Sequence, residues 1–111
     1  MFVAGRYAYA GKYRERKAYQ HTIEDSIYLH PDYVGKGHAK AMLSELCERC
    51  AQLNVKVVIA VIGMPNDYDA ATHPSVRMHA KVGFNVCGQL PNVGFKHDRW
   101  LKTVLMQKQL S

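Results

Sequence analysis

The sequence has little that would mark a membrane, secreted or metal-binding protein. Its 111 residues contain no apolar run that approaches membrane-spanning length, and no charged N-terminal segment precedes a long apolar core. Only three cysteines are present, an odd number that argues against a disulfide framework, and the six histidines lack metal-ligand spacing. We therefore expect one cytoplasmic domain over residues 1–111, with reduced cysteines, no metal and no membrane contact.

The chain also lacks a clustered nucleic-acid-binding face. Fifteen Lys and Arg against nine Asp and Glu give a formal net charge of +6, which favours an anionic partner. The basic residues are scattered apart from Lys12–Lys17, with no aromatic residues interleaved in a basic face. A small molecule that carries phosphates would use the same charge, and we expect no nucleic-acid partner.

Hydrophobic patterning predicts an α/β (α+β) domain with the element order β-β-α-β-α-β-β. A nearly continuous β-branched run, Val55–Ile62, predicts a central strand covered on both faces. An apolar stripe that includes Cys47 and Cys50 predicts a helix from Gly37 to a stop near Asn54, and core packing of both cysteines. The other expected elements are strands at Phe2–Ala10, Tyr19–Leu29, Phe84–Leu90 and Trp100–Gln107, a helix at Pro74–Val82 ended by Gly83, a turn at Gly63–Asp67 and a loop at Pro91–His97.

A glycine-rich turn between the second strand and the first helix is a candidate anion site. Gly35 and Gly37 leave backbone N–H groups accessible, and the following helix offers its unpaired N–H groups and positive dipole end. The turn has neither the third glycine of the dinucleotide motif nor the Gly-Lys-Ser/Thr ending of a P-loop. Taken alone, it is either an ordinary turn or a pyrophosphate cradle.

Several segments spread over nearly the whole chain carry a family resemblance. They are Ala18–Tyr19 with Thr22–Glu24, Tyr28–Pro31, Val58–Asp67, Pro74–His79, Val82–Phe84, and Gly94–His97 with Trp100. Together they resemble the GNAT superfamily of acetyl-CoA-dependent N-acetyltransferases, most closely its phosphinothricin and methionine sulfoximine acetyltransferase branch. The resemblance implies a mixed, mostly antiparallel sheet flanked by helices, and an enzyme that moves acetyl from acetyl-CoA to the amine of a small amino-acid-like acceptor.

For acetyl-CoA, the resemblance implies a cofactor-binding site that begins on the second strand. The family signature Arg/Gln-x-x-Gly-x-Gly/Ala falls on Val34, Gly35, Lys36, Gly37, His38 and Ala39. Val34 departs from the usual polar residue, which should weaken the cradle without abolishing it, because backbone N–H groups bind most of the phosphate. The pantetheine arm would meet main-chain groups of Tyr28 and Leu29, the side-chain amide of Asn66, and Ser75. Ordinary strand and turn roles are the alternatives for these residues.

For the chemistry, the resemblance implies Glu24 as the general base and His79 as a donor of the proton that the departing thiolate needs. Asp25 points to the opposite face of an extended strand, so we expect only Glu24 to face the site. Arg16 and His97 match positions near an acidic amino-acid substrate, where a guanidinium can grip a carboxylate or phosphinate. The alternatives are a solvated charge for Glu24 and Arg16, and a structural role for His79 and His97.

Two features depart from the family pattern. The family domain normally begins with a strand, two helices and a further strand before the segment that starts here at Phe2, so we expect a partial, N-terminally truncated domain with an exposed strand edge and apolar surface. A second copy would cover that surface, as a homodimer with or without exchanged strands. Tyr68–His73 looks like an insertion beside the cofactor site. The alternative functions are a non-catalytic acyl-CoA-binding protein that lacks an acceptor site, and a module that binds nucleic acid or another anion.

Overall fold

The structure is a computed structural model that describes residues 2–3, 6–12, 20–29 and 38–110, with the backbone alone for residues 2–12 and 26–29 of these. Across these residues the elements, in chain order, are β1 (Phe2–Val3), β2 (Arg6–Lys12), β3 (Thr22–Leu29), α1 (His38–Gln52), β4 (Val57–Pro65), the 3-10 helix η3 (Ala70–Thr72), α2 (Pro74–Val82), β5 (Asn85–Lys96) and β6 (Arg99–Gln109).

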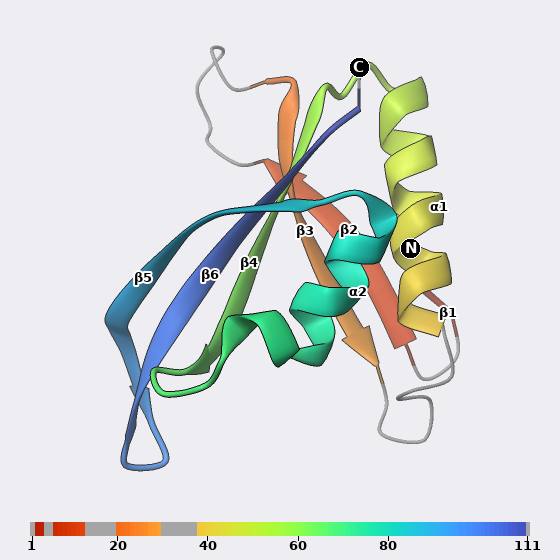
Figure 1. Ribbon diagram of the computed structural model, residues 1–111. Coiled ribbons are helices and arrows are strands. Elements are labelled where there is room, and N and C mark those ends of the chain that lie inside the picture. Colours follow the sequence, from red (N-terminus) through yellow and green to blue (C-terminus); the bar gives the residue numbers. More distant parts are fainter. Residues whose placement is uncertain (1, 4–5, 13–19, 30–37, 111) are drawn as a thin grey trace.

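One sheet runs through the domain in the order β1-β2-β3-β4-β6-β5 (Figure 1). All neighbouring strands are antiparallel except β3 and β4, which are parallel and are joined by the crossover that contains α1. The sheet is therefore mixed and mostly antiparallel, as the sequence predicts.

The parallel pair is incomplete. Pairing runs from Thr22 opposite Val57 to Asp25 opposite Ala60, although β3 continues to Leu29 and β4 to Pro65. Beyond Asp25, β3 stays paired with β2 on its outer edge, and β4 stays paired with β6. The two strands consequently separate toward their C-terminal ends, where α1 begins (Figure 1). We call this opening, between 26–29 of β3 and 61–65 of β4, the fork.

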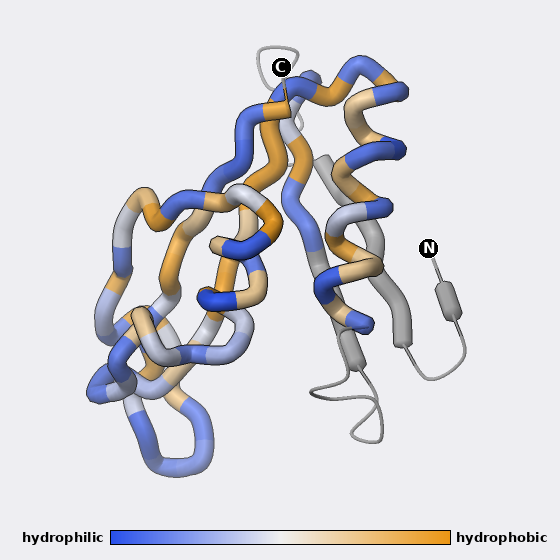
Figure 2. The backbone as a smooth tube through the Cα atoms, turned by 45° about the vertical axis from the view of Figure 1, so that its right-hand side comes forward, coloured by the Kyte–Doolittle hydropathy of each residue, from blue (hydrophilic) through white to orange (hydrophobic). Residues whose placement is uncertain are grey.

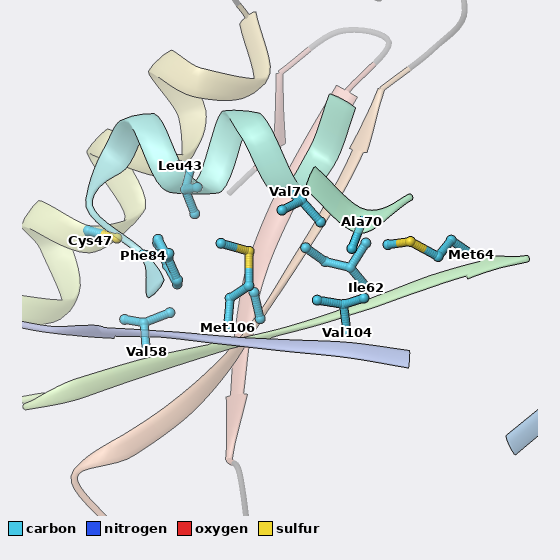
Figure 3. Close-up of a cluster of buried hydrophobic side chains, with 11 residues drawn as sticks. Leu43, Cys47, Val58, Ile62, Met64, Ala70, Val76, Phe84, Val104 and Met106 are labelled. Atoms are coloured by element: carbon cyan, nitrogen blue, oxygen red, sulfur yellow. The ribbon is translucent and has the colours of Figure 1, made fainter. Parts of the chain in front are cut away.

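Both helices pack on one face of the sheet, the covered face. Alternate residues of β4, from Val58 to Met64, are buried there against α1, α2 and the inward side chains of β6. Figure 3 shows Leu43 and Val76 of the helices above Val58, Ile62, Val104 and Met106 of the strands. The hydrophobic residues accordingly concentrate in β4, β6 and the inner side of α1, while the tip of the β5–β6 hairpin is hydrophilic (Figure 2).

The opposite, open face of the sheet has no helix over it in the described part of the chain. Val61 and Leu90, which point to this face, are 44% and 48% exposed. The expectation that β4 is covered on both faces was therefore wrong: its burial alternates along the strand. The continuous apolar run in the sequence comes from apolar residues on the open face as well as on the covered one.

Local signals located the helices better than the loops. α2 and its left-handed cap at Gly83 match the prediction, and Asn54 takes a left-handed φ of 65° just after α1. Strand boundaries differ from the expectation: β2 continues through Gly11, β4 includes Gly63–Pro65, and β5 runs through Pro91–Lys96 to a tight turn at His97–Asp98. Smaller shifts occur at the starts of β4 and β5 and at both ends of β6. The first predicted strand is also divided into β1 and β2, and β3 begins at Thr22 rather than Tyr19.

Candidate functional site

The backbone of β3 enters the fork at its last four residues. Tyr28 and Leu29 lie beyond the last rung with β4, so the edge of β3 that faces β4 has no strand partner there in the described residues. Such an edge presents N–H and C=O groups that an extended ligand can pair with. Of the expected cradle, Val34, Gly35, Lys36 and Gly37 lie outside the described residues. His38 and Ala39 form the first turn of α1, and both are partly buried.

Two neighbouring carboxylates on β3 lie in different environments. Glu24 is partly buried and is paired in register with Ile59, whose side chain belongs to the open face. Asp25 is paired with Ala60 on the covered face, at the last rung before the fork, and is only 8% exposed. The pleat therefore separates the two acids, as expected from their spacing.

Asp25 meets His79 inside the core. Nε2 of His79 lies 3.2 Å from Oδ2 and 3.4 Å from Oδ1 of Asp25, and His79 is 3% exposed. The ring of Phe84 packs edge-on against the imidazole at 5.0 Å between centroids. The structure thus brings His79 to Asp25, and Glu24 points away from both. Sequence reasoning set Asp25 aside, although its position two residues after Ile23 places it on the apolar face.

The other ring nitrogen of His79 is also engaged. Nδ1 donates to the backbone carbonyl oxygen of Ser75 at 2.7 Å, and the Ser75 hydroxyl lies 3.4 Å from the same nitrogen. Ser75 is the second residue of α2 and is partly buried, so its hydroxyl is the most accessible part of this cluster.

The segment before α2 is folded. Asp69 caps η3 by accepting from the N–H of Ala71, and Ala70 is buried in the core. His73 caps α2, because its Nδ1 accepts the Ser75 N–H at 3.1 Å. Burial lowers the pKa of His73. The Tyr68–His73 segment therefore builds the start of α2.

Asn66, the residue after β4, is held by hydrogen bonds to both β6 and β5. Its backbone N–H donates to the carbonyl of Trp100, its side-chain Nδ2 donates to Oδ1 of Asn92, and its Oδ1 accepts the Asn92 N–H at 3.2 Å. On the Asn66 side chain, Nδ2 keeps one N–H donor and Oδ1 keeps one acceptor lone pair for a ligand. Asn92 sits in the irregular part of β5 with a φ of 60°, and nothing in the sequence pattern pointed to this contact.

The two candidate substrate contacts, Arg16 and His97, are not brought together with the other site residues in the described part of the chain. Arg16 lies outside the described residues. His97 is exposed in the β5–β6 turn and makes no hydrogen bond or ion pair with Glu24 or His79 among the described residues.

Cys47 and Cys50 are buried free thiols, as expected, and burial raises the pKa of Cys47 to about 11. No group of three potential metal ligands occurs in the described ranges, and none of the helices there is long and apolar enough to span a membrane.

The sequence of residues 3–84 matches the model of the acetyltransferase (GNAT) family. The chain belongs to the GNAT acetyltransferase family. It is 43% identical to a phosphinothricin N-acetyltransferase of Alcaligenes faecalis, over 95% of this chain and 51% of that protein. It is 38% identical to an L-methionine sulfoximine/L-methionine sulfone acetyltransferase of Salmonella typhimurium, over 94% of this chain and 57% of that protein.

Solved GNAT structures share the fold. The phosphinothricin acetyltransferase of Sinorhizobium meliloti, in complex with AcCoA, superimposes with a TM-score of 0.84 at 47% sequence identity, over 96% of this chain and 54% of that one. The chain thus spans about half the length of the relatives it matches.

Proposed function

We propose that this GNAT chain transfers an acetyl group from acetyl-CoA to the amine of a small amino-acid-like acceptor. One observation carries the proposal: the match to phosphinothricin and methionine sulfoximine acetyltransferases extends over nearly all of this chain and includes the strands of the fork.

Features of the fork are compatible with acetyl-CoA as the donor. The unpartnered edge of β3 at Tyr28 and Leu29 offers backbone groups to an amide-containing arm, and the N-terminus of α1 at His38 and Ala39 favours phosphate oxygens. The amide of Asn66 and the hydroxyl of Ser75 lie at the ends of the elements that follow. Acetyl-CoA, when bound, supplies an acetyl group already activated as a thioester. The remaining signature residues, Val34, Gly35, Lys36 and Gly37, would complete the phosphate site.

Glu24 is the proposed general base. Its carboxylate lies two residues before the fork, on the face that carries no helix in the described residues. An amine that approaches from the open face can lose its proton to this carboxylate and then attack the thioester carbonyl as a neutral nucleophile. Arg16 and His97 are the proposed contacts for the acidic group of the acceptor.

We further propose that a second copy of the chain covers the open face, in a cytoplasmic homodimer. The support is apolar surface on that face, including Val61 and Leu90, together with the outer edge of β5, which has no strand partner in the described residues. Free thiols at all three cysteines are consistent with a reducing compartment. Exchange of strands between the copies is one form of this dimer. Sedimentation that shows a well-folded monomer at micromolar concentration would rule it out.

The direct test is release of free thiol from acetyl-CoA with a panel of amines. Phosphinothricin and methionine sulfoximine head the panel, and spermidine and a peptide N-terminus serve as unrelated acceptors. We expect turnover with the first two and a rise in melting temperature with acetyl-CoA alone. A thermal shift without turnover for any amine would instead indicate a protein that only binds acyl-CoA, and no shift near saturation would refute the donor site.

A further inference from the structure

The buried Asp25–His79 pair lies at the point where β3 and β4 separate. Asp25 occupies the last rung of the parallel pair, opposite Ala60, so the pair forms the floor of the fork on the covered side. Both side chains are almost fully buried, at 5% and 4% exposure. A buried ion pair at this place is costly unless its hydrogen bonds are complete, which makes it a feature to explain.

The contacts of His79 determine how many protons the pair holds. The Ser75 carbonyl oxygen can only accept, so the 2.7 Å contact requires a proton on Nδ1. The 3.2 Å contact between Nε2 and Asp25 requires a second proton between those two atoms. The pair therefore holds two protons, one on Nδ1 and one between Nε2 and the Asp25 carboxylate. With the second proton on Nε2, the pair is an imidazolium beside a carboxylate.

Ser75 is the least buried member of the cluster around His79. His79 itself is 3% exposed, so a ligand in the fork cannot reach its ring nitrogens directly. The hydroxyl of Ser75 is partly buried, lies 3.4 Å from Nδ1 and belongs to the first turn of α2. Of the three side chains in the cluster, only that of Ser75 is not fully buried, so it is the one that a ligand could reach.

We propose that Asp25, His79 and Ser75 form a proton relay for the leaving group of acetyl transfer, with Asp25 as a positioning residue. The inference rests on the proposed function. When the carbon–sulfur bond of the donor breaks, the Ser75 hydroxyl gives its proton to the departing sulfur and takes the Nδ1 proton of His79. His79 becomes neutral and keeps its Nε2–H bond to the Asp25 carboxylate. The proton that Glu24 removes from the amine passes to solvent, and solvent later returns one to His79, so charge and protons balance.

The groups that face the pair from the packed elements are few in the described residues. The thiol of Cys47 on α1 interacts electrostatically with Lys108 of β6 and with Asp25. The Lys108 ammonium donates to the carbonyl of Val82 at 2.7 Å, which fixes it at the end of α2. The thiol of Cys47, whose pKa burial raises to about 11, stays protonated near neutral pH. Neither group supplies the second proton of the pair.

The protonation state can be tested without any activity. We would label the histidines with ¹⁵N, assign His79 by its loss in His79→Gln, and observe both ring nitrogens in the wild-type chain. Two protonated nitrogens are expected in the wild type, because each ring nitrogen faces an acceptor. A wild-type His79 with a single protonated nitrogen would overturn the inference whether or not the chain transfers acetyl.

Kinetics test the relay itself, provided that the wild type transfers acetyl in the assay above. Asp25→Asn and Ser75→Ala should each lower kcat by about 10²-fold with little change in the KM for acetyl-CoA, and Ser75→Thr should restore most of kcat by returning a hydroxyl. Glu48→Gln on the exposed side of α1 is the matched carboxylate-to-amide control and should leave kcat unchanged. A Ser75→Ala variant that raises KM alone would reduce Ser75 to a binding residue and overturn the relay. A wild type without turnover would refute the proposed function. The ¹⁵N result would still show whether His79 beside Asp25 carries two protons.

Discussion

The two faces of the sheet differ in what surrounds the same strand. On the covered face, β3 presents Ile23 and Asp25 to the helices, and the carboxylate is satisfied by His79. On the open face, the same strand presents Glu24, with no hydrogen bond or ion pair to another described residue. Two adjacent acids thus have different chemistry available to them, and the pleat alone makes the difference. A base that must reach a substrate belongs on the open face, and a group that stores a proton belongs on the covered one.

A change at Glu24 should have the largest effect on activity, because Glu24 is the acid on the open face. Glu24→Gln keeps the size and polarity of the side chain and removes its ability to take a proton. We expect kcat for acetyl transfer to fall roughly 10²–10⁴-fold, with the melting temperature nearly unchanged because the Glu24 side chain makes no hydrogen bond or ion pair with another described residue. Initial rates of thiol release measure the effect. Full turnover by the variant would remove Glu24 as the base.

The packing of the two faces is compared by two identical substitutions on β4. Val58 is fully buried on the covered face, and Val61 is 44% exposed on the open one. Val58→Ala removes two buried methyl-sized groups and leaves a cavity, so the free energy of unfolding should fall by about 2–3 kcal/mol. Val61→Ala should cost less than about 1 kcal/mol. Urea denaturation of both variants measures the difference.

The same pair of variants tests the proposed dimer. If a second copy covers the open face, the cost of Val61→Ala will grow with protein concentration, because the substitution then also weakens association. The cost of Val58→Ala should not depend on concentration in this way. Equal effects of both substitutions at low concentration would mean that the open face is covered within a single chain.

Much of this arrangement follows from short-range sequence signals. Pro74 at the first turn and Gly83 past the last one delimit α2, and the cap and the glycine act within a few residues of the helix they end. The face on which Glu24 and Asp25 lie follows from the strand period alone. The residues that match the GNAT pattern gave the family and the mostly antiparallel sheet before any coordinates.

The rest depends on contacts that no local pattern encodes. Pro91, Asn92 and Gly94 are typical turn residues, yet they lie in an edge strand, where a bulge accommodates them. That Asp25 meets His79, 54 positions later, depends on how α2 docks on the sheet. The length of the fork likewise depends on where the pairing between β3 and β4 stops. Neither strand's own sequence specifies that point, because it depends on contacts with the rest of the sheet.

The covered face depends on how α2 ends, which Gly83 controls. Its φ of 107° is rarely adopted by L side chains, and an added Cβ would lie 3.4 Å from the Lys108 side chain. Gly83→Ala should therefore lower the free energy of unfolding by about 1–2 kcal/mol. Gly88→Ala is the matched control, because nothing lies within 4 Å of a Cβ there, and it should be close to neutral. Thermal unfolding of both variants decides whether the backbone conformation, rather than loss of a glycine as such, matters.

The start of α2 should give a smaller, pH-dependent effect. His73 caps the helix through an unprotonated Nδ1, and burial lowers its pKa in the folded state, so the unfolded chain binds the proton more readily. The contribution of this cap is present above the pKa of about 6.5 in the unfolded chain and is lost as the pH falls through the lower folded value. His73→Asn supplies a cap that does not titrate in this range. We expect the two proteins to have similar melting temperatures at pH 7.5, with the wild type losing more stability than the variant as the pH falls below 6.5. Parallel melting curves across that range would show that the imidazole does not serve as the cap, and α2 would then begin without help from the Tyr68–His73 segment.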